Sequence, residues 1–168
     1  MSKKSTLLLK RVFVELNTRI RRINRQRRGE GLSETRPCEV TLLGQMSLLV
    51  DPRASEALSL AQTADLDALL KMDHAVKEEF KKILRAEGLI YDEDSPLIWI
   101  PKDAKIRKVI DVGSITIKAI DAESALVSKA VKAPEKNKQL IREAIASEAF
   151  PGLVKRLLKN GGKLEDFL

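Results

Sequence analysis

The stretch that decides the fold is Thr63-Ala64-Asp65-Leu66-Asp67-Ala68-Leu69-Leu70, in which two acids stand inside an apolar run. We expect it to form one β-strand. Side chains at positions i and i+2 of a strand leave the same face, roughly 6–7 Å apart along it, so Asp65 and Asp67 would share a face. Two carboxylates held in this way can bind a hard divalent cation such as Mg²⁺. The pair is our candidate metal site, and the alternative is an exposed strand end.

A second Asp-x-Asp sequence serves as a comparison within the same chain. Asp92-Glu93-Asp94 lies between Tyr91 and Ser95-Pro96, where polar turn-forming residues cluster, so we expect a solvated loop there. The first pair differs because it lies in apolar surroundings. Acids in such surroundings cost free energy unless a metal or another partner compensates them.

Length and composition predict one globular domain. The chain has 168 residues, of which 43% are hydrophobic and 33% charged. Cys38 is the only cysteine and His74 the only histidine, which excludes an intrachain disulfide and a cysteine zinc site. No apolar run is long enough for a membrane span, and the apolar stretch near Met1 is too short for a secretory signal. We expect a cytoplasmic protein with no membrane partner.

The basic charge is concentrated at the start of the chain. Residues 1–36 hold eleven Lys/Arg and three Glu, whereas the remainder holds 20 basic and 21 acidic residues. Residues 6–27 have one apolar stripe at helical spacing, and arginines occupy the other faces. One interpretation is a contact surface for RNA. The other is a solvated helix face, since no aromatic residues alternate with the arginines and arginines near a helix C-terminus favour the helix dipole.

The remaining pattern predicts an α+β fold, with a mixed β-sheet, flanking helices and a C-terminal helical segment. Expected strands are 38–43, 63–70, 97–100, 106–112 and 115–120, the last two joined by a Gly113-Ser114 hairpin turn. Expected helices are 45–50, 53–61, 74–87, 121–132, 135–147 and one after Pro151, and the tail 164–168 would dock back. We divide the single domain into a basic helix and linker (1–36), a core (37–132) and C-terminal helices (133–168).

These motifs resemble the minimal nucleotidyltransferases of the polymerase-β superfamily, particularly the toxin- and antitoxin-associated branch. Gly44 matches the first residue of a strand-to-helix turn, and Ser47 falls on a small-residue position of that helix. Asp65-Leu66-Asp67 matches the acidic pair, which Thr63 precedes. The segment Asp121–Lys129 is similar to a glutamate-bearing helix start followed by a lysine. The likeness spans roughly residues 38 to 140.

The resemblance implies a nucleotidyltransferase-like core, with Mg²⁺ held by Asp65 and Asp67. It implies a nucleoside triphosphate bound through Gly44 and Ser47, with Lys129 contacting a triphosphate oxygen as a point charge. Asp65, Asp67 and Lys129 would be the catalytic residues. The reaction would transfer a nucleotidyl group to a hydroxyl or phosphate on an RNA or a protein.

The chain also departs from the family pattern. Gln45 replaces the second glycine or serine of the turn, and Lys136-Asn137 replaces a Lys-Asp pair. The family usually has a third carboxylate on a neighbouring strand, and Asp111 is the one good candidate for it here. These features fit either a divergent enzyme or an inactive nucleotidyltransferase fold that binds RNA or a protein. A third hypothesis is an interaction protein that offers the apolar stripe of its first helix to a partner.

Overall fold

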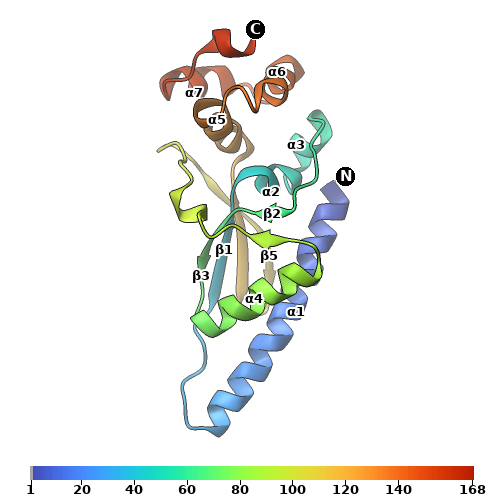
Figure 1. Cartoon of the computed structure of the whole chain (residues 1–168), viewed down its shortest axis with the longest axis vertical. Helices are drawn as coiled ribbons and strands as arrows, with labels where there is room; N and C mark the ends of the chain where they lie inside the picture. The colour runs from blue at the N-terminus through green and yellow to red at the C-terminus, as the bar shows by residue number, and fades with distance from the viewer. Residues whose placement is uncertain (1) are drawn as a thin grey trace.

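A four-stranded mixed sheet lies at the centre of the chain, which a computed structural model describes over residues 2–168 (Figure 1). The strand order is β3-β1-β6-β5, with β1 parallel to β6 and antiparallel to β3, and β5 antiparallel to β6. The bounds are β1 Cys38–Leu42, β3 Ala68–Lys71, β5 Ile106–Val112 and β6 Ile115–Ile120. The α+β class and the β5–β6 hairpin are confirmed.

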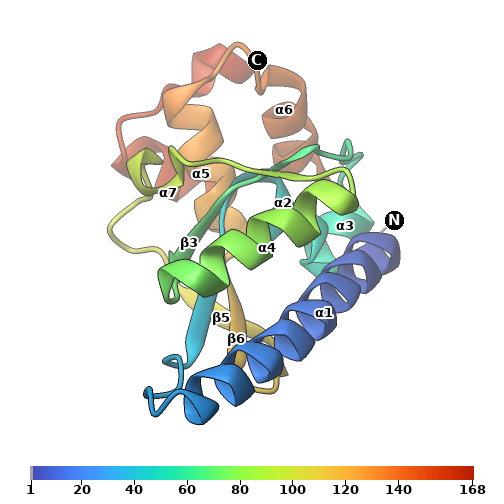
Figure 2. The ribbon, with the colours of Figure 1, turned by 60° about the horizontal axis from the view of Figure 1, so that its bottom comes forward.

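Two helices, α1 (Ser2–Gly29) and α4 (His74–Ala86), cross one face of the sheet side by side (Figure 2). They meet through Phe13 and Phe80, whose stacked rings have centroids 5.4 Å apart. The predicted apolar stripe of α1 is buried there: Leu9, Val12, Phe13, Leu16 and Ile20. The stripe therefore packs within the molecule, so the hypothesis of an exposed stripe for a partner is wrong.

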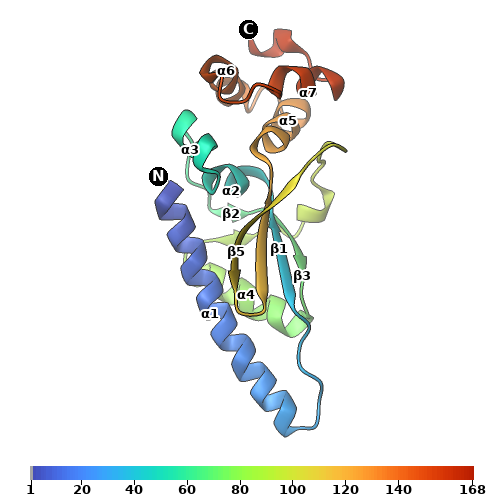
Figure 3. The ribbon, with the colours of Figure 1, turned by 180° about the vertical axis from the view of Figure 1, so that it is seen from behind.

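No helix of residues 2–168 covers the opposite face of the sheet (Figure 3). Alternation explains this, since β1 and β6 bury every second side chain and leave the others partly exposed. On the open face Glu39 forms ion pairs with Lys118 and, at 3.5 Å, with Lys71. One side of the sheet thus contributes to the core while the other carries charges.

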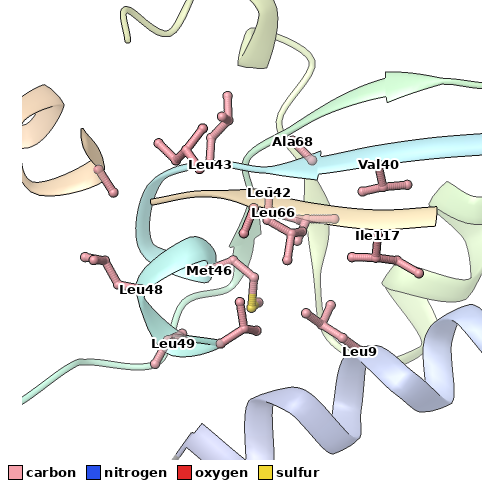
Figure 4. Close-up of a cluster of buried hydrophobic side chains, with 14 of the residues drawn as sticks. Leu9, Val40, Leu42, Leu43, Met46, Leu48, Leu49, Leu66, Ala68 and Ile117 are labelled. Atoms are coloured by element: carbon pink, nitrogen blue, oxygen red, sulfur yellow. The ribbon is translucent and has the colours of Figure 1, made fainter. Parts of the chain in front are cut away.

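Two short helices, α2 (Gly44–Leu49) and α3 (Pro52–Ala57), follow β1. Met46, Leu48 and Leu49 of α2 enter the core beside β1 and β6 (Figure 4). Asp51 then caps α3, because its carboxylate accepts a hydrogen bond from the Ala54 N–H at 3.0 Å. The predicted helix 53–61 is too long, since the chain becomes extended at the residue after Ala57.

The acidic stretch is not one strand, so the prediction of a continuous strand 63–70 is wrong. It forms β2 (Asp65–Leu66) and β3, interrupted at Asp67. The reason is that its two halves have different partners: β2 pairs in parallel with β4 (Ile90–Tyr91), and β3 pairs with β1. The strand β4 was not expected from the sequence.

Residues 97–100 are not a strand either. Ser95–Leu97 forms a 3₁₀ helix, η1, and the next three residues have no regular structure. Pro96 has no backbone N–H to donate to a neighbouring strand. The carbonyl of Trp99 instead accepts a hydrogen bond from the Ser128 hydroxyl at 2.5 Å. This segment is therefore tied to a helix rather than to the sheet.

The C-terminal part is helical, as expected. It contains α5 (Ala122–Lys132), α6 (Lys138–Ser147), α7 (Leu153–Lys159) and a 3₁₀ helix, η2 (Leu164–Phe167), gathered at one end of the sheet (Figure 1). Phe167 is buried, which confirms that the tail docks back. None of the helices in the described part of the chain combines the length and the apolarity that crossing a membrane requires.

Candidate active site

Two aspartates meet where the acidic stretch is interrupted. Because β2 and β4 are parallel with Leu66 opposite Tyr91, the next residues, Asp67 and Asp92, come side by side. The Asp92 N–H donates to the Leu66 carbonyl at 2.9 Å, which continues the ladder by one bond. Neighbouring side chains in register leave the sheet on the same side, so the two carboxyls approach each other.

The position of Asp92 corrects the sequence analysis, which treated Asp92-Glu93-Asp94 as a solvated loop. Glu93 and Asp94 are exposed, but Asp92 is half-buried and its carboxylate accepts a hydrogen bond from the Asp94 N–H at 2.9 Å. Ser95 holds the turn in place, since its hydroxyl donates to the Asp92 carbonyl at 2.6 Å. Ile90 and Tyr91, the apolar pair directly before Asp92, were the one sign in the sequence of a short strand that ends at this point.

Gly44 lies directly against Asp67. A Cβ atom placed on Gly44 would come within 2.5 Å of Oδ2 of Asp67, and the glycine has φ +53°, in the left-handed region. The backbone joins the two segments as well, because the Leu43 N–H donates to the Asp67 carbonyl at 2.8 Å. The turn after β1 and Asp67 are thus in contact.

The environment of Asp67 disfavours its negative charge. Burial raises the pKa of Asp67 to about 6, and the adjacent Asp92 adds to the rise through a hydrogen bond and through repulsion between the carboxyls. The charge of Lys129 lowers this pKa, and that of Asp65 raises it slightly. This local excess of negative charge is what a cation would compensate.

Lys129 approaches the acids from α5. Its side chain is half-buried, and burial lowers its pKa; the charge of Asp67 opposes this change, and Lys136 adds to it. The lysine therefore reaches the field of Asp67 from a separate element. Of the residues proposed from the sequence, Gly44 lies against Asp67, and Lys129 is near enough for its charge to affect the pKa of Asp67.

The other proposed residues are placed less favourably. Asp65 is exposed at the start of β2, where its N–H donates to the Thr63 hydroxyl at 3.1 Å. Ser47 is fully buried, and its hydroxyl donates to the Gly44 carbonyl at 2.6 Å. The hydroxyl is therefore bonded within its own helix, α2. Gln45 donates to the Ala61 carbonyl at 2.8 Å.

Asp111 does not belong to this cluster. It is exposed on β5 opposite Thr116, and it pairs with Lys108. Thr116 in turn lies opposite Glu39, near the start of β1, whereas Gly44 follows the end of that strand. Asp111 is thus near the other end of the sheet, and the carboxylate that lies beside Asp67 is that of Asp92.

An ion network fixes the start of α5 and therefore the direction in which Lys129 extends. Asp121 caps the helix by accepting from the Ser124 N–H at 3.1 Å. Arg156 of α7 pairs with Asp121 at 2.8 Å and with Glu123 at 3.4 Å. Burial alone would raise the pKa of Asp121, but the hydrogen bonds from Ser124 and Arg156 outweigh it and lower the pKa. Arg156 thus ties α7 to the start of α5, the helix that carries Lys129.

The chemistry of the donors at the cluster fits Mg²⁺ in part. In the part of the chain that the structure describes, no three His, Cys, Asp or Glu side chains form a ready-made metal cage. Mg²⁺ is nevertheless commonly bound through one or two carboxylates together with phosphate oxygens of a substrate. Asp67 and Asp92 could hold it in that way, with Asp65 further out.

One hollow, of about 720 Å³, lies elsewhere. It borders Arg36, Cys38 and Lys71, at the end of the sheet away from Gly44. Comparison of the chain with family models, curated proteins and solved structures finds no match.

Proposed function

We propose that the chain is a metal-dependent nucleotidyltransferase, which transfers a nucleotidyl group from a nucleoside triphosphate to an RNA or protein acceptor. The observation that carries the proposal is that Asp67 contacts Gly44, lies beside Asp92 and feels the charge of Lys129. These groups come from four separate parts of the chain. A half-buried carboxyl with a raised pKa, next to a second carboxyl and near a half-buried lysine, is typical of a functional site.

Each group has a role in this reaction. Asp67 and Asp92 would hold Mg²⁺, which when bound would neutralise the triphosphate and stabilise the charge that develops on it. Lys129 contacts a phosphate oxygen, and Gly44 lets the triphosphate approach the backbone because it has no side chain. The acceptor oxygen bonds to the α-phosphorus and its proton passes to water, while the bond from the α-phosphorus to the bridging oxygen breaks and pyrophosphate leaves.

One observation favours an alternative, an inactive nucleotidyltransferase fold that binds RNA or a protein. Ser47, a nucleotide-binding residue in the resemblance, is fully buried and bonded within its own helix. Under this alternative the cluster would no longer bind triphosphate. Nucleotide binding therefore separates the two functions.

The test is calorimetric titration of each nucleoside triphosphate, with and without Mg²⁺, into the wild type and the Asp92→Asn variant. We expect Mg²⁺-dependent binding by the wild type and a loss of at least about tenfold in the variant, equivalent to about 1.4 kcal/mol, because one of two metal-binding carboxylates is neutralised. Asp92 is the informative position because its place beside Asp67 follows from the pairing of β2 with β4 and not from the local sequence.

Asp94→Asn is the matched control. It also removes one negative charge, but from an exposed side chain two residues after Asp92. It should bind as the wild type does. Equal losses in the two variants would show that general charge, and not the site, is responsible. A correctly folded wild type that binds no triphosphate would contradict the enzyme proposal and favour the inactive fold.

A further inference from the structure

The arginines of α1 divide into two groups once their contacts are known. Arg11, Arg19 and Arg28 form ion pairs with Glu87, Glu79 and Glu34, respectively, and Arg27 donates to the Ser33 carbonyl at 2.5 Å. In the described part of the chain, Arg21, Arg22 and Arg25 form no ion pair and are exposed. The second group holds charge that the fold itself does not neutralise.

These three arginines lie on the part of α1 that extends past the core. Beyond Ile20, none of the described side chains of the helix is fully buried. Figure 3 shows this end of α1 reaching past the ends of the strands. Burial of the helix therefore does not require arginine at 21 or 25.

Arg21 and Arg25, one turn apart, face the turn of the β5–β6 hairpin across a hollow of about 420 Å³. We call this hollow the arginine pocket. Its lining residues are Asn17, Ile20, Arg21, Asn24, Arg25, Arg28, Glu34, Gly113 and Ser114. Glu34 is the only acid among them and is paired with Arg28, which leaves the charges of Arg21 and Arg25 in excess.

We propose that the arginine pocket binds the sugar-phosphate backbone of RNA. Two guanidinium groups in a polar hollow complement phosphate, for which they provide forked donors. Neutral donors and acceptors lie in the same hollow, namely Asn17 and the exposed Ser114, and they suit a ribose 2′-hydroxyl that DNA lacks. No aromatic side chain lines the hollow, so contact is with the backbone and not with stacked bases.

This pocket is separate from the acid cluster. It lies at the hairpin-turn end of β6, whereas the cluster lies beyond the other end; the five residue steps from Ile115 to Ile120 alone span roughly 16 Å. RNA binding here requires neither Mg²⁺ nor a nucleotide. The two proposals can therefore fail independently.

The test is fluorescence anisotropy of a labelled RNA hairpin, without nucleotide, over a series of salt concentrations. We expect Arg21→Gln/Arg25→Gln to weaken binding about tenfold and to flatten the logarithmic salt dependence by about 1.5, because two phosphate contacts are lost. Lys4→Gln/Lys10→Gln removes the same charge from exposed positions at the other end of α1 and should change the affinity less than about twofold.

A substitution on the opposite wall tests the pocket as a unit. Ser114→Asp should weaken RNA binding by repulsion, whereas Ser114→Ala removes only one hydroxyl and should have a smaller effect. Equal losses in the two α1 double variants would overturn the pocket, as would a folded wild type that binds no RNA. Equal affinity for a DNA hairpin of the same sequence would overturn the assignment to RNA.

Discussion

Gly44→Ala is expected to lower the free energy of unfolding by about 2–4 kcal/mol and to abolish Mg²⁺-dependent triphosphate binding. Two effects combine at this position. An alanine at φ +53° is strained, and its Cβ would lie 2.5 Å from Oδ2 of Asp67, much closer than a non-bonded contact allows. The Asp67 carboxyl must move, and it is one of the two groups that we assign to the metal.

Gly88→Ala separates these effects. Gly88 ends α4 with φ +78°, and no atom lies within 4 Å of the Cβ that alanine would add. It should therefore show the backbone strain alone, about 1–2 kcal/mol, and retain triphosphate binding. Urea denaturation of both variants measures the difference. If the two glycines proved equally sensitive, the contact between Gly44 and Asp67 would not matter for stability.

Elements with a strong local signal were predictable from the sequence. The β5–β6 hairpin needed only two β-branched runs around Gly113-Ser114, and α5 needed a capping Asp121 before an apolar periodic run. The apolar stripe of α1 predicted a buried face, which is where Phe13 meets Phe80. In each case the interactions that define the element lie close together in the chain or repeat at helical spacing.

Asp92 was not predictable by the same reasoning, because its role depends on a partner strand. Its local sequence is that of a turn, and Glu93 and Asp94 behave accordingly. Only the parallel pairing of β2 with the two-residue strand β4 brings Asp92 beside Asp67. A strand so short has no periodicity to detect. The interruption of the acidic stretch at Asp67 has the same origin, since it follows from two different pairing partners.

The C-terminal helices show a further limit of sequence reasoning. Their existence was predictable, but their use in holding α5 was not. Arg156 reaches back to Asp103 at 3.1 Å and to Asp121, which lie far from it in the chain. Side-chain pairs over such separations leave no pattern in a single sequence. Thus the residues of the site were partly predictable, whereas their supports were not.

Asp67→Asn is expected to stabilise the protein at pH 8 by roughly 2 kcal/mol and to have little effect near pH 4. The folded pKa of about 6 lies above the ordinary value of 3.8, so between these values the unfolded chain has released the proton while the folded chain keeps it. Stability of the wild type therefore falls as pH rises through this window. The full shift corresponds to about 3 kcal/mol, which partial access of solvent reduces.

Thermal unfolding at a series of pH values measures this effect. For a chain of 168 residues, 2 kcal/mol corresponds to a rise in Tm of roughly 4–8 °C at pH 8. Asp94→Asn should follow the wild type at every pH, since Asp94 is exposed. Identical pH profiles for Asp67→Asn and the wild type would contradict the raised pKa. A gain in stability together with a loss of triphosphate binding would instead mean that Asp67 is kept in an unfavourable environment for its function, because substitutions that remove a functional strain commonly stabilise a fold.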